Sequence, residues 1–352
     1  MIFLGDFVYP FEEEKNILNF DKKFLKEEKM LNLESLLLDP SKHEKLTKGI
    51  ALYSTEYMYS LLKKLNVKAV GLANNHITDF KYDISSLKQK LLKKDIQSCG
   101  AGENFEDAIK PVLIEDEKYK YVVYSFGWDV IGCKYANTSK QGTAPLDEKI
   151  AIQCTKDAKV RYADRKIIIF LHWNIEYEYY PQPADRKMAF SLIDAGADAI
   201  IGHHPHIVGV YEEYKKKPIF YSIGNFFLPD YTYQGFKIES SERSLLGLGV
   251  KYHELSNEIE LFWIKSDNKS LHLEKSEKLN ESDNIEVITD LYQNDLSAYK
   301  KWFKVHRRKK KLLPIYETHE KTLKNRILFE LLELRNYIVH NITAIGLRKK
   351  NN

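Results

Sequence analysis

Histidine, asparagine and aspartate side chains follow several short apolar runs in this 352-residue chain. They are Asp6, Asn74, Asn75, His76, His172, His203, His204 and His206. Imidazole nitrogens, a carboxylate and amide oxygens suit Mn, Fe or Zn, and mixed sets of these ligands commonly hold two ions. The residue types therefore indicate a site for one or two divalent metal ions.

Apolar runs separated by longer amphipathic stretches predict an α/β fold, in which strands alternate with helices. The predicted strands are 2–5, 67–72, 121–126, 166–171, 198–202 and 218–223. Helical spacing over 184–195 and a helix stop at Gly196 indicate a βαβ unit between the fourth and fifth of these strands. Ligands of open α/β sheets bind at the carboxyl ends of the strands, where each candidate residue falls. The sheet should therefore bring these residues together.

Each of these signals has a structural alternative. A single histidine at the end of a strand is more often a hydrogen-bonded structural residue than a metal ligand, and Asn-Asn commonly forms turns. The joint pattern favours a site, because unrelated structural residues would not all follow strands at one edge of a sheet. His204 and His206 flank a single residue, so both can point into one cleft.

The pattern of apolar and polar residues changes beyond residue 250. Apolar and polar residues then alternate up to about residue 278, which predicts an antiparallel ribbon that completes the sheet. Residues 284–300 and 318–339 are predicted to be helices, and residues 300–311 hold eight Lys or Arg and no acid. We therefore expect a core domain over 1–280 and a helical, basic C-terminal appendage over 281–352.

The appendage has two interpretations. Residues 300–311 are either a solvated linker or a contact for phosphates, acidic lipid headgroups or an anionic polymer. The last helix should pack on its own domain or on a partner through an apolar stripe. This stripe is Leu323, Ile327, Leu331, Leu334 and Ile338. A basic chain end adds the hypothesis of a peripheral membrane contact through 300–350.

Composition argues against several classes of protein. A net charge of +4 at pH 7 is small for this length, so no nucleic-acid partner is expected. Three cysteines without CxxC spacing argue against a disulfide framework and against a thiolate zinc site. The chain shows no signal peptide and no run of about 18 apolar residues. We therefore expect a cytoplasmic protein, with peripheral contact at the inner face of the membrane as a hypothesis.

Several longer strings carry a resemblance to a known family. They are GLANNHITDF (71–80), CGAGENFEDA (99–108), FLHWNIEYEYYP (170–181), AGADAIIGHHPHIVG (195–209) and KPIFYSIGNFFL (217–228), with GD at 5–6 and NLES at 32–35. In this order they resemble the motifs of the CapA family, which is named for capsule and poly-γ-glutamate biosynthesis. The resemblance covers about residues 1–250. It implies an α/β fold of the calcineurin-like metallophosphoesterase type, a four-layered α/β/β/α sandwich with its metal site at the sheet edge.

Carried over position by position, the resemblance implies a set of metal ligands. They are Asp6, Glu34, Asn75, His172, His204 and His206. It also implies that Glu34 bridges two ions, and that His76 is the catalytic residue that contacts substrate and protonates the leaving group. The alternative for Glu34 is a surface acid at the start of a helix, with Asn32 as its cap.

One motif departs from the wider superfamily, whose members begin with Asp-x-His. Here Asp6 is followed by Phe7 and Val8, so one ligand is missing. A single ion or a weakly loaded second site is therefore an open alternative.

Four more residues are predicted to bind substrate or to support the ligands. They are Asn74, Glu176, His203 and Asn225. Glu176 would orient a ligand histidine or bind a substrate amine, unless it is only solvated. His203 would stack on substrate or point away from the site. Asn225 would shape the cleft floor or form a turn.

The resemblance and the candidate site together predict a metal-dependent hydrolase. Its target would be a phosphoester or amide bond of a capsular or other cell-surface polymer, of the poly-γ-glutamate or polysaccharide type, or of its precursor. The expected partner is an anionic polymer or a phosphorylated precursor. The alternative is a non-catalytic, polymer-binding component of a capsule assembly machinery, which the missing histidine favours. The sequence leaves the metal, the substrate and the oligomeric state open.

Overall fold

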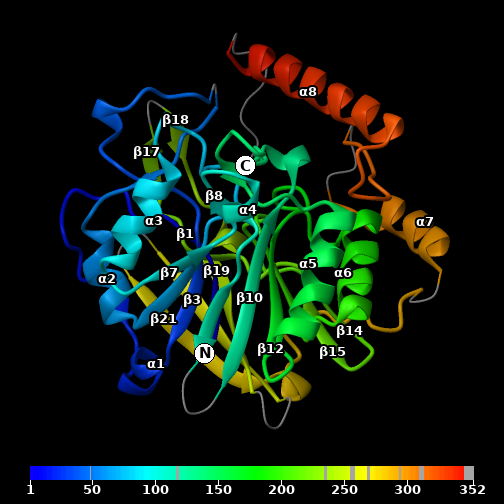
Figure 1. Ribbon diagram of the computed structural model, residues 1–352, viewed down its shortest axis with the longest axis horizontal. Helices are drawn as coiled ribbons and strands as arrows, with labels where there is room; N and C mark the ends of the chain where they lie inside the picture. Colours follow the sequence, from blue (N-terminus) through cyan, green and yellow to red (C-terminus); the bar gives the residue numbers. More distant parts are fainter. Residues whose placement is uncertain are drawn as a thin grey trace.

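The protein is a mixed α/β structure built around two β-sheets (Figure 1). The computed structural model describes residues 1–344 except 48, 116–118, 234–235, 254–257, 268–269, 293–294 and 309–312. Within the described residues, no helix is long and apolar enough to cross a bilayer.

The larger sheet mixes parallel and antiparallel strands. Its order is β2-β21-β20-β19-β1-β3-β6-β7, and β16 also pairs with β1. The bounds are β1 (Ile2–Phe7), β2 (Leu18–Asn19), β3 (Lys29–Leu33), β6 (Val67–Gly71), β7 (Gln97–Cys99), β16 (Asn225–Phe227), β19 (Leu246–Tyr252), β20 (Ile259–Ser266) and β21 (Leu271–Lys278). β1, β3, β6 and β7 run parallel, whereas β19, β20 and β21 form the antiparallel part. The predicted ribbon after residue 250 is thus confirmed.

The smaller sheet has the order β14-β15-β13-β12-β10-β9. The bounds are β9 (Val112–Glu115), β10 (Lys120–Gly127), β12 (Lys166–His172), β13 (Ala199–His203), β14 (Tyr211–Tyr214) and β15 (Lys217–Phe220). Three short ribbons lie outside the two sheets. They pair β4 (Leu36–Leu37) with β5 (Tyr53–Ser54), β8 (Ala101–Gly102) with β11 (Gly142–Thr143), and β17 (Tyr231–Tyr233) with β18 (Phe236–Ile238).

Helices cover the outer face of each sheet, α2 and α3 on the larger and α5 and α6 on the smaller. Their bounds are α1 (Lys22–Lys26), α2 (Met58–Lys64), α3 (Ile84–Leu92), α4 (Phe105–Ala108), α5 (Glu148–Arg161), α6 (Pro183–Ala195), α7 (Leu296–His306) and α8 (Leu323–Ala344). In Figure 1, α2 and α3 lie beside the larger sheet, and α5 and α6 lie on the opposite side, beside the smaller one.

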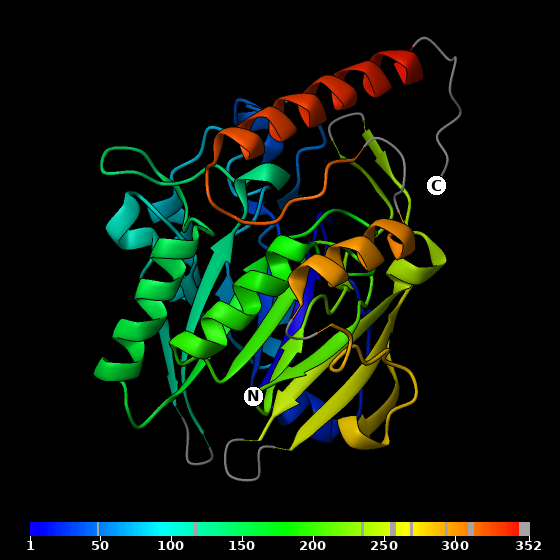
Figure 2. The same ribbon diagram turned by 90° about the vertical axis from the view of Figure 1, so that its right-hand side faces the viewer.

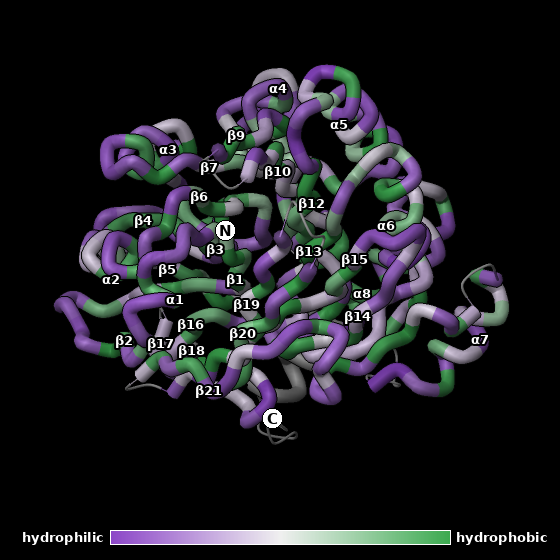
Figure 3. The backbone as a smooth tube through the Cα atoms, turned by 90° about the horizontal axis from the view of Figure 1, so that it is seen from below, coloured by the Kyte–Doolittle hydropathy of each residue, from purple (hydrophilic) through white to green (hydrophobic). Residues whose placement is uncertain are grey.

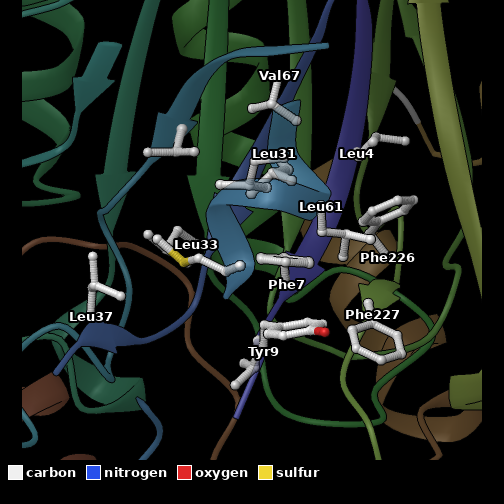
Figure 4. Close-up of a cluster of buried hydrophobic side chains, with 14 of the residues drawn as sticks. Leu4, Phe7, Tyr9, Leu31, Leu33, Leu37, Leu61, Val67, Phe226 and Phe227 are labelled. Atoms are coloured by element: carbon white, nitrogen blue, oxygen red, sulfur yellow. The ribbon is translucent and has the colours of Figure 1, made fainter. Parts of the chain in front are cut away.

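Three apolar clusters separate these layers. One lies between the two sheets and contains Phe3 of β1 and Phe170 of β12, whose ring centroids are 6.3 Å apart. A second cluster packs the larger sheet against α2 and α3, and Figure 4 shows its labelled side chains around β1 and β3. The third packs the smaller sheet against α5 and α6. Figure 3 shows apolar strands in the middle of the molecule. The predicted four-layered α/β/β/α sandwich is therefore confirmed.

The predicted βαβ unit is the part of the fold that prepares the site. α6 begins at Pro183, which suits the first turn of a helix, and it ends at Gly196, whose φ of 119° favours glycine. The chain returns as β13, parallel to β12, with His172 directly opposite His203. This unit thus brings His172 and His203, which are 31 positions apart in the sequence, to the ends of adjacent strands.

Two helix predictions beyond residue 280 are wrong in their bounds. The helix expected over 284–300 begins only at Leu296, because Asp295 caps it by accepting a hydrogen bond from the Ala298 amide at 2.9 Å. The helix expected over 318–339 begins at Leu323, because Thr322 caps it by accepting a hydrogen bond from the Asn325 amide at 3.1 Å.

The predicted stripe of the last helix does not pack on its own domain, so that half of the prediction is wrong, whereas packing on a partner stays a prediction. Leu323, Ile327, Leu331 and Leu334 are each more than half exposed. Leu328 and Leu332 face the body instead, and Leu332 is only 7% exposed. The side chain of Ile338 lies outside the described residues. Figure 2 shows α8 lying across the outside of the molecule, away from both sheets.

Candidate metal centre

The predicted site lies where the parallel strands of both sheets end. The site has two halves, one in each sheet, and the strand register determines which residues of each half are neighbours. In the larger sheet, Asp6 lies between Asn32 of β3 and Asn225 of β16. In the smaller sheet, His172 lies opposite His203. Because both sheets present their carboxyl ends at this edge, residues from distant parts of the chain meet here.

Asp6 is fully buried and accepts two hydrogen bonds. The Asn32 side-chain amide donates to Oδ1 at 2.7 Å, and the His204 backbone amide donates to Oδ2 at 3.1 Å. The nearest ring nitrogens are Nδ1 of His206 at 3.3 Å and Nδ1 of His203 at 3.5 Å. Asp6 is therefore fixed in orientation with imidazoles beside both of its oxygens.

Glu34 follows β3 and is also fully buried. Its Oε1 lies 3.4 Å from Nε2 of His172, and its Oε2 lies 3.9 Å from Nδ1 of His206. Neither oxygen has a hydrogen-bond partner. The alternative in which Glu34 is a surface acid at a helix start is wrong, because no helix begins there and the side chain faces the site.

His172 joins the two halves of the site. Its Nε2 lies 2.7 Å from Oδ1 of Asn75, and its Nδ1 lies 2.7 Å from Nδ1 of His203. His203, which the sequence analysis gave a substrate-binding or supporting role, is completely buried. It lies among the candidate ligands rather than at the surface of the cleft.

Two groups of side chains have the composition and spacing of metal sites. Each group has one ligand atom per residue, and these atoms lie within 4.8 Å of one another. The groups are Asp6, His172 and His203, and Glu34, His204 and His206. The buried Nε2 of His203 and Nδ1 of His204 have no hydrogen-bond partner, like both oxygens of Glu34. Buried polar atoms without partners cost free energy, and a divalent cation bound between them would remove that cost. The residues present therefore fit one or two divalent ions.

At Asp6 and at three of the histidines, the electrostatics favour the protonation states that bind cations. Burial would raise the pKa of Asp6, but the hydrogen bond with His206 and the charge of His203 lower it below its usual value. Burial and the neighbouring histidines lower the pKa of His172 and His204 well below the usual range, and burial lowers that of His203 to about 4. A carboxylate and neutral imidazoles are the forms that coordinate metals.

Glu34 and His206 are shifted in the opposite direction. Burial and the charge of Asp6 raise the pKa of Glu34 to about 8. Burial would lower the pKa of His206, but the charges of Glu34 and Asp6 raise it well above its usual value. Two buried carboxylates close together disfavour each other's ionisation unless a cation lies between them. A cation bound between Asp6 and Glu34 would favour the ionised form of both carboxylates.

His76 stands at the rim of the site, where it is partly buried. Its Nδ1 lies 2.6 Å from Oδ2 of Asp79, and Asp79 also accepts a hydrogen bond from the Leu52 amide at 2.9 Å. Burial would lower the pKa of His76, but the hydrogen bond and charge of Asp79 and the charge of Glu34 raise it. Asp79 thus orients the imidazole that the sequence singled out.

The other three supporting residues also touch the site or its cleft. The side chain of Asn74 donates to the Leu33 carbonyl at 2.8 Å, and its oxygen accepts from the His76 amide at 3.1 Å. Oδ1 of Asn225 lies 2.9 Å from Nδ1 of His206. Glu176 lines the cleft beside these residues.

The sequence analysis missed Asn32 as a partner of Asp6 and Asp79 as a partner of His76. Asp79 lies in the same string as His76, three residues further on, and that spacing was a usable signal. Asn32 lies in β3, a strand that was not predicted, so its proximity to Asp6 became visible only in the fold.

The site opens into a cleft of about 1150 Å³. Asn75, His76, His206 and Asn225 form part of its wall. Two residues at the site have positive φ without being glycine, His204 at 95° and His206 at 60°. Such backbone conformations are unfavourable for residues with a Cβ and gather at functional sites. These backbone conformations set the directions of the two histidine side chains on either side of Pro205.

Comparisons with known families and curated proteins agree on one family. The family model described as "Bacterial capsule synthesis protein PGA_cap" matches residues 5–230. The chain is 32% identical over 195 residues to the capsule biosynthesis protein CapA of Bacillus anthracis, which covers 54% of this chain and 47% of that protein. It is 32% identical over 199 residues to the PGA biosynthesis protein CapA of Bacillus subtilis strain 168, covering 55% and 51%. The matched part is thus about half of the length of these relatives.

Solved structures with a similar arrangement include a phosphatase from Mycoplasma pneumoniae. Its TM-score is 0.40 at 14% identity, covering 79% of this chain and 91% of that chain. A putative 5'-nucleotidase from Staphylococcus aureus matches with a TM-score of 0.36 at 14% identity, covering 70% of this chain and 44% of that one.

Proposed function

The chain belongs to the bacterial capsule synthesis family PGA_cap, and we propose that it is a metal-dependent hydrolase. Its target would be a phosphoester or amide bond in a capsular or other cell-surface polymer or in the precursor of one. The expected resemblance to the CapA family is confirmed by the relatives of that name.

One observation carries the proposal. Both oxygens of Glu34, Nε2 of His203 and Nδ1 of His204 are buried without hydrogen-bond partners. They belong to two groups of potential ligands, which reach the cleft through His206. A folded protein rarely leaves several polar atoms unsatisfied in one place unless they bind something.

The proposed ligands are those that the motifs indicated, namely Asp6, Glu34, Asn75, His172, His204 and His206. His203 joins them as a candidate, because it lies in one of the two groups. When bound, divalent cations supply Lewis acidity at a phosphoryl or carbonyl oxygen of the substrate. Asn32 holds Asp6 in the orientation that a ligand needs.

His76 is the proposed catalytic residue of the chain itself. It lines the cleft beside Asn75, and Asp79 fixes its ring through Nδ1. In this orientation the imidazole can donate a proton or a hydrogen bond to a leaving oxygen or nitrogen at the mouth of the site. Asp79 would act as a positioning residue, because its Oδ2 lies 2.6 Å from Nδ1 of His76 and is itself fixed by the Leu52 amide.

Metal content per chain, measured by elemental analysis on protein purified without chelator, tests the proposal. We expect one or two ions in the wild type and loss of at least one in His204→Ala. The matched control His272→Ala changes a histidine on β21 and should keep the wild-type content. Metal-loaded protein is then screened against phosphoesters and γ-glutamyl amides. Absence of metal in the wild type, even after Mn, Fe or Zn is added, would refute the proposal.

A second candidate function rests on Phe7 and Val8, which follow Asp6 where the wider superfamily has Asp-x-His. Neither side chain supplies a ligand, because both consist only of carbon and hydrogen. A polymer-binding component of capsule assembly that does not turn its ligand over fits this reduced set. It is favoured if metal binds but no phosphoester or amide is cleaved.

The cytoplasmic location, the absence of a nucleic-acid partner and the membrane contact stay predictions. The exposed apolar stripe of α8 gives the membrane contact its physical basis. Cosedimentation with anionic vesicles at low salt tests it. Retention of the protein in the supernatant would refute it.

A further inference from the structure

The basic segment 300–311 contributes to the cleft. Its two interpretations, a solvated linker or a contact for anionic groups, did not place it there. Arg308 lines the cleft together with His76 and His206 of the metal centre. It comes from a part of the chain beyond the residues 5–230 that the family model matches. The basic segment therefore places one of its cations beside the proposed active site.

A buried anchor fixes the backbone at this point. Arg307 is only 3% exposed, and its Nη1 donates to the carbonyls of Leu313 and Pro314 at 3.1 and 3.3 Å. The backbone amide of Arg308 donates to Oε1 of the buried Glu178 at 3.0 Å. Glu178 belongs to the loop between His172 and α6. The position of Arg308 is thus tied directly to the loop that leaves the metal centre.

The helix before this anchor packs on the same loop. The hydroxyl of Tyr299 donates to the Pro181 carbonyl at 2.8 Å, and the ring of Trp302 lies 4.8 Å from that of Tyr180. Figure 2 shows α7 beside α6. Arg308 is therefore held by a packed element and not by a free tail.

Two other cations without ion pairs line the cleft. They are Lys134, which follows the 3₁₀ turn Asp129–Ile131, and Arg243, which lies in the 3₁₀ turn Glu242–Leu245. Among the residues that the structure describes, Lys134, Arg243 and Arg308 form no salt bridge. Their side chains are exposed to the cleft, so a ligand can reach them.

The cleft also contains acids, and they only partly offset these cations. Asp79 is bonded to His76, and Glu239 is paired with Lys237. Glu176 and Glu242 are the remaining acids of the lining. Three cations without an acidic partner thus exceed the acids that are left to balance them. Unpaired guanidinium groups at the wall of a cleft favour carboxylate or phosphate groups.

We propose that Arg308, with Arg243 and Lys134, forms an anion-binding subsite in the cleft beside the metal centre. The subsite holds a carboxylate or phosphate group of a substrate whose reacting bond lies at the metals. Such a substrate carries at least two anionic groups, or one anionic group that lies away from the bond that reacts. The statement about the reacting bond rests on the proposed hydrolase function, whereas the subsite itself does not.

Calorimetric titration of the full chain at low salt tests the subsite. One arm uses γ-linked hexaglutamate as a carboxylate probe, and the other uses inorganic tripolyphosphate as a phosphate probe. Metal content is measured before and after titration, so that removal of metal by tripolyphosphate is not taken for binding. We expect Arg308→Ala to weaken binding of at least one probe roughly tenfold, and Arg308→Lys to restore part of the loss.

The control variant is Arg326→Ala, which removes an exposed arginine of α8 outside the cleft. It should bind like the wild type. Weakening for hexaglutamate alone identifies a carboxylate ligand, and weakening for tripolyphosphate alone identifies a phosphate ligand. The subsite is refuted if neither probe binds, if Arg308→Ala binds like the wild type, or if Arg326→Ala is equally weakened. If binding depends on Arg308 but the chain hydrolyses no substrate, the subsite is supported and only the hydrolase proposal is refuted.

Discussion

Asn32 is the residue on which the geometry of Asp6 most directly depends. Its amide donates to Oδ1 of Asp6 at 2.7 Å, and its own oxygen accepts from Asn74 at 3.3 Å. Removing a group that orients a metal ligand typically lowers metal affinity by about 10- to 100-fold.

We therefore expect Asn32→Ala to bind metal about 10- to 100-fold more weakly than the wild type. Titration of metal-depleted protein with Mn²⁺ or Zn²⁺ measures this. Asn284→Ala, at an exposed position of the loop after β21, is the control and should titrate like the wild type. Equal affinity of Asn32→Ala and wild type would mean that Asp6 is not a ligand or does not need this partner.

Lys29 of β3 is a lysine inside the protein, and its charge makes stability depend on pH. Its side chain is completely buried, and Nζ donates to the carbonyls of Phe24 and Glu27 at 2.6 and 2.7 Å. Burial lowers its pKa from 10.5 to about 7. Below pH 7 both the folded and the unfolded chain carry the proton, and the folded state bears the cost of the buried charge.

Between pH 7 and 10.5 the unfolded chain binds more protons at Lys29 than the folded chain does. The contribution of Lys29 to stability therefore rises with pH across this window, by at most about 1.4 kcal/mol per pH unit. We expect the difference in unfolding free energy between wild type and Lys29→Met to show this rise in urea titrations. Lys68→Met, at a half-exposed lysine of β6, should show no such rise. A pH-independent difference for Lys29→Met would contradict the lowered pKa.

Among the elements, the pair β1 and β16 brings Asp6 to its place through very close backbone packing. A Cβ on Gly5 would lie 1.8 Å from the Gly224 carbonyl oxygen, so no side chain fits there without separating the two strands. The Asp6 amide donates to the same oxygen at 3.2 Å. The glycine before Asp6 is thus required by packing.

Gly5→Ala should lower the unfolding free energy by roughly 3 kcal/mol or more, because backbone on both sides must move. It should also weaken metal binding, since Asp6 moves with the strand. The matched control is Gly49→Ala, where the nearest atom to the new Cβ is 3.9 Å away. Denaturant unfolding of the two variants measures the contrast. Similar stability in both would show that the strand pair tolerates the displacement.

On the scale of the whole molecule, part of the predicted appendage is continuous with the core. Tyr299, Phe303 and Tyr316 are completely buried. The Ala184 amide of α6 donates to the Tyr316 carbonyl at 3.0 Å, and Nε2 of the buried His319 lies 2.9 Å from Oδ1 of Asp185. The domain boundary at residue 280 stays a prediction, but these contacts make the segment 296–322 important for stability.

A chain ending at residue 295 should therefore be less stable than the full chain by more than about 3 kcal/mol, from the loss of three buried aromatic side chains. A chain ending at residue 322 is the control. It lacks α8, whose first turns are largely exposed, and should lose much less. Thermal unfolding of the three chains compares them. Equal stability of the shortest and the full chain would support an independent appendage.

Much of the architecture follows from local patterns in the sequence. The strand predicted at 166–171, the helix predicted over 184–195 and its stop at Gly196 were predictable, because each has a local signal in the form of an apolar run, helical spacing or a glycine. The order of motifs was enough to identify the family and the four-layered sandwich. The candidate ligands Asp6, Asn75, His172, His204 and His206 were predictable because each follows a strand, and parallel strands end at one edge of a sheet.

The tertiary structure decided what depends on contacts between distant segments. The proximity of Asn32 to Asp6 follows from strand register, and the burial of His203 from the packing of one sheet on the other. The face of α8 that packs against the body depends on the surface that this helix meets. In the same way, Arg308 lies at the cleft because the buried Arg307 fixes the backbone there. Periodicity and charge describe one segment at a time, so they cannot say which partner that segment will find.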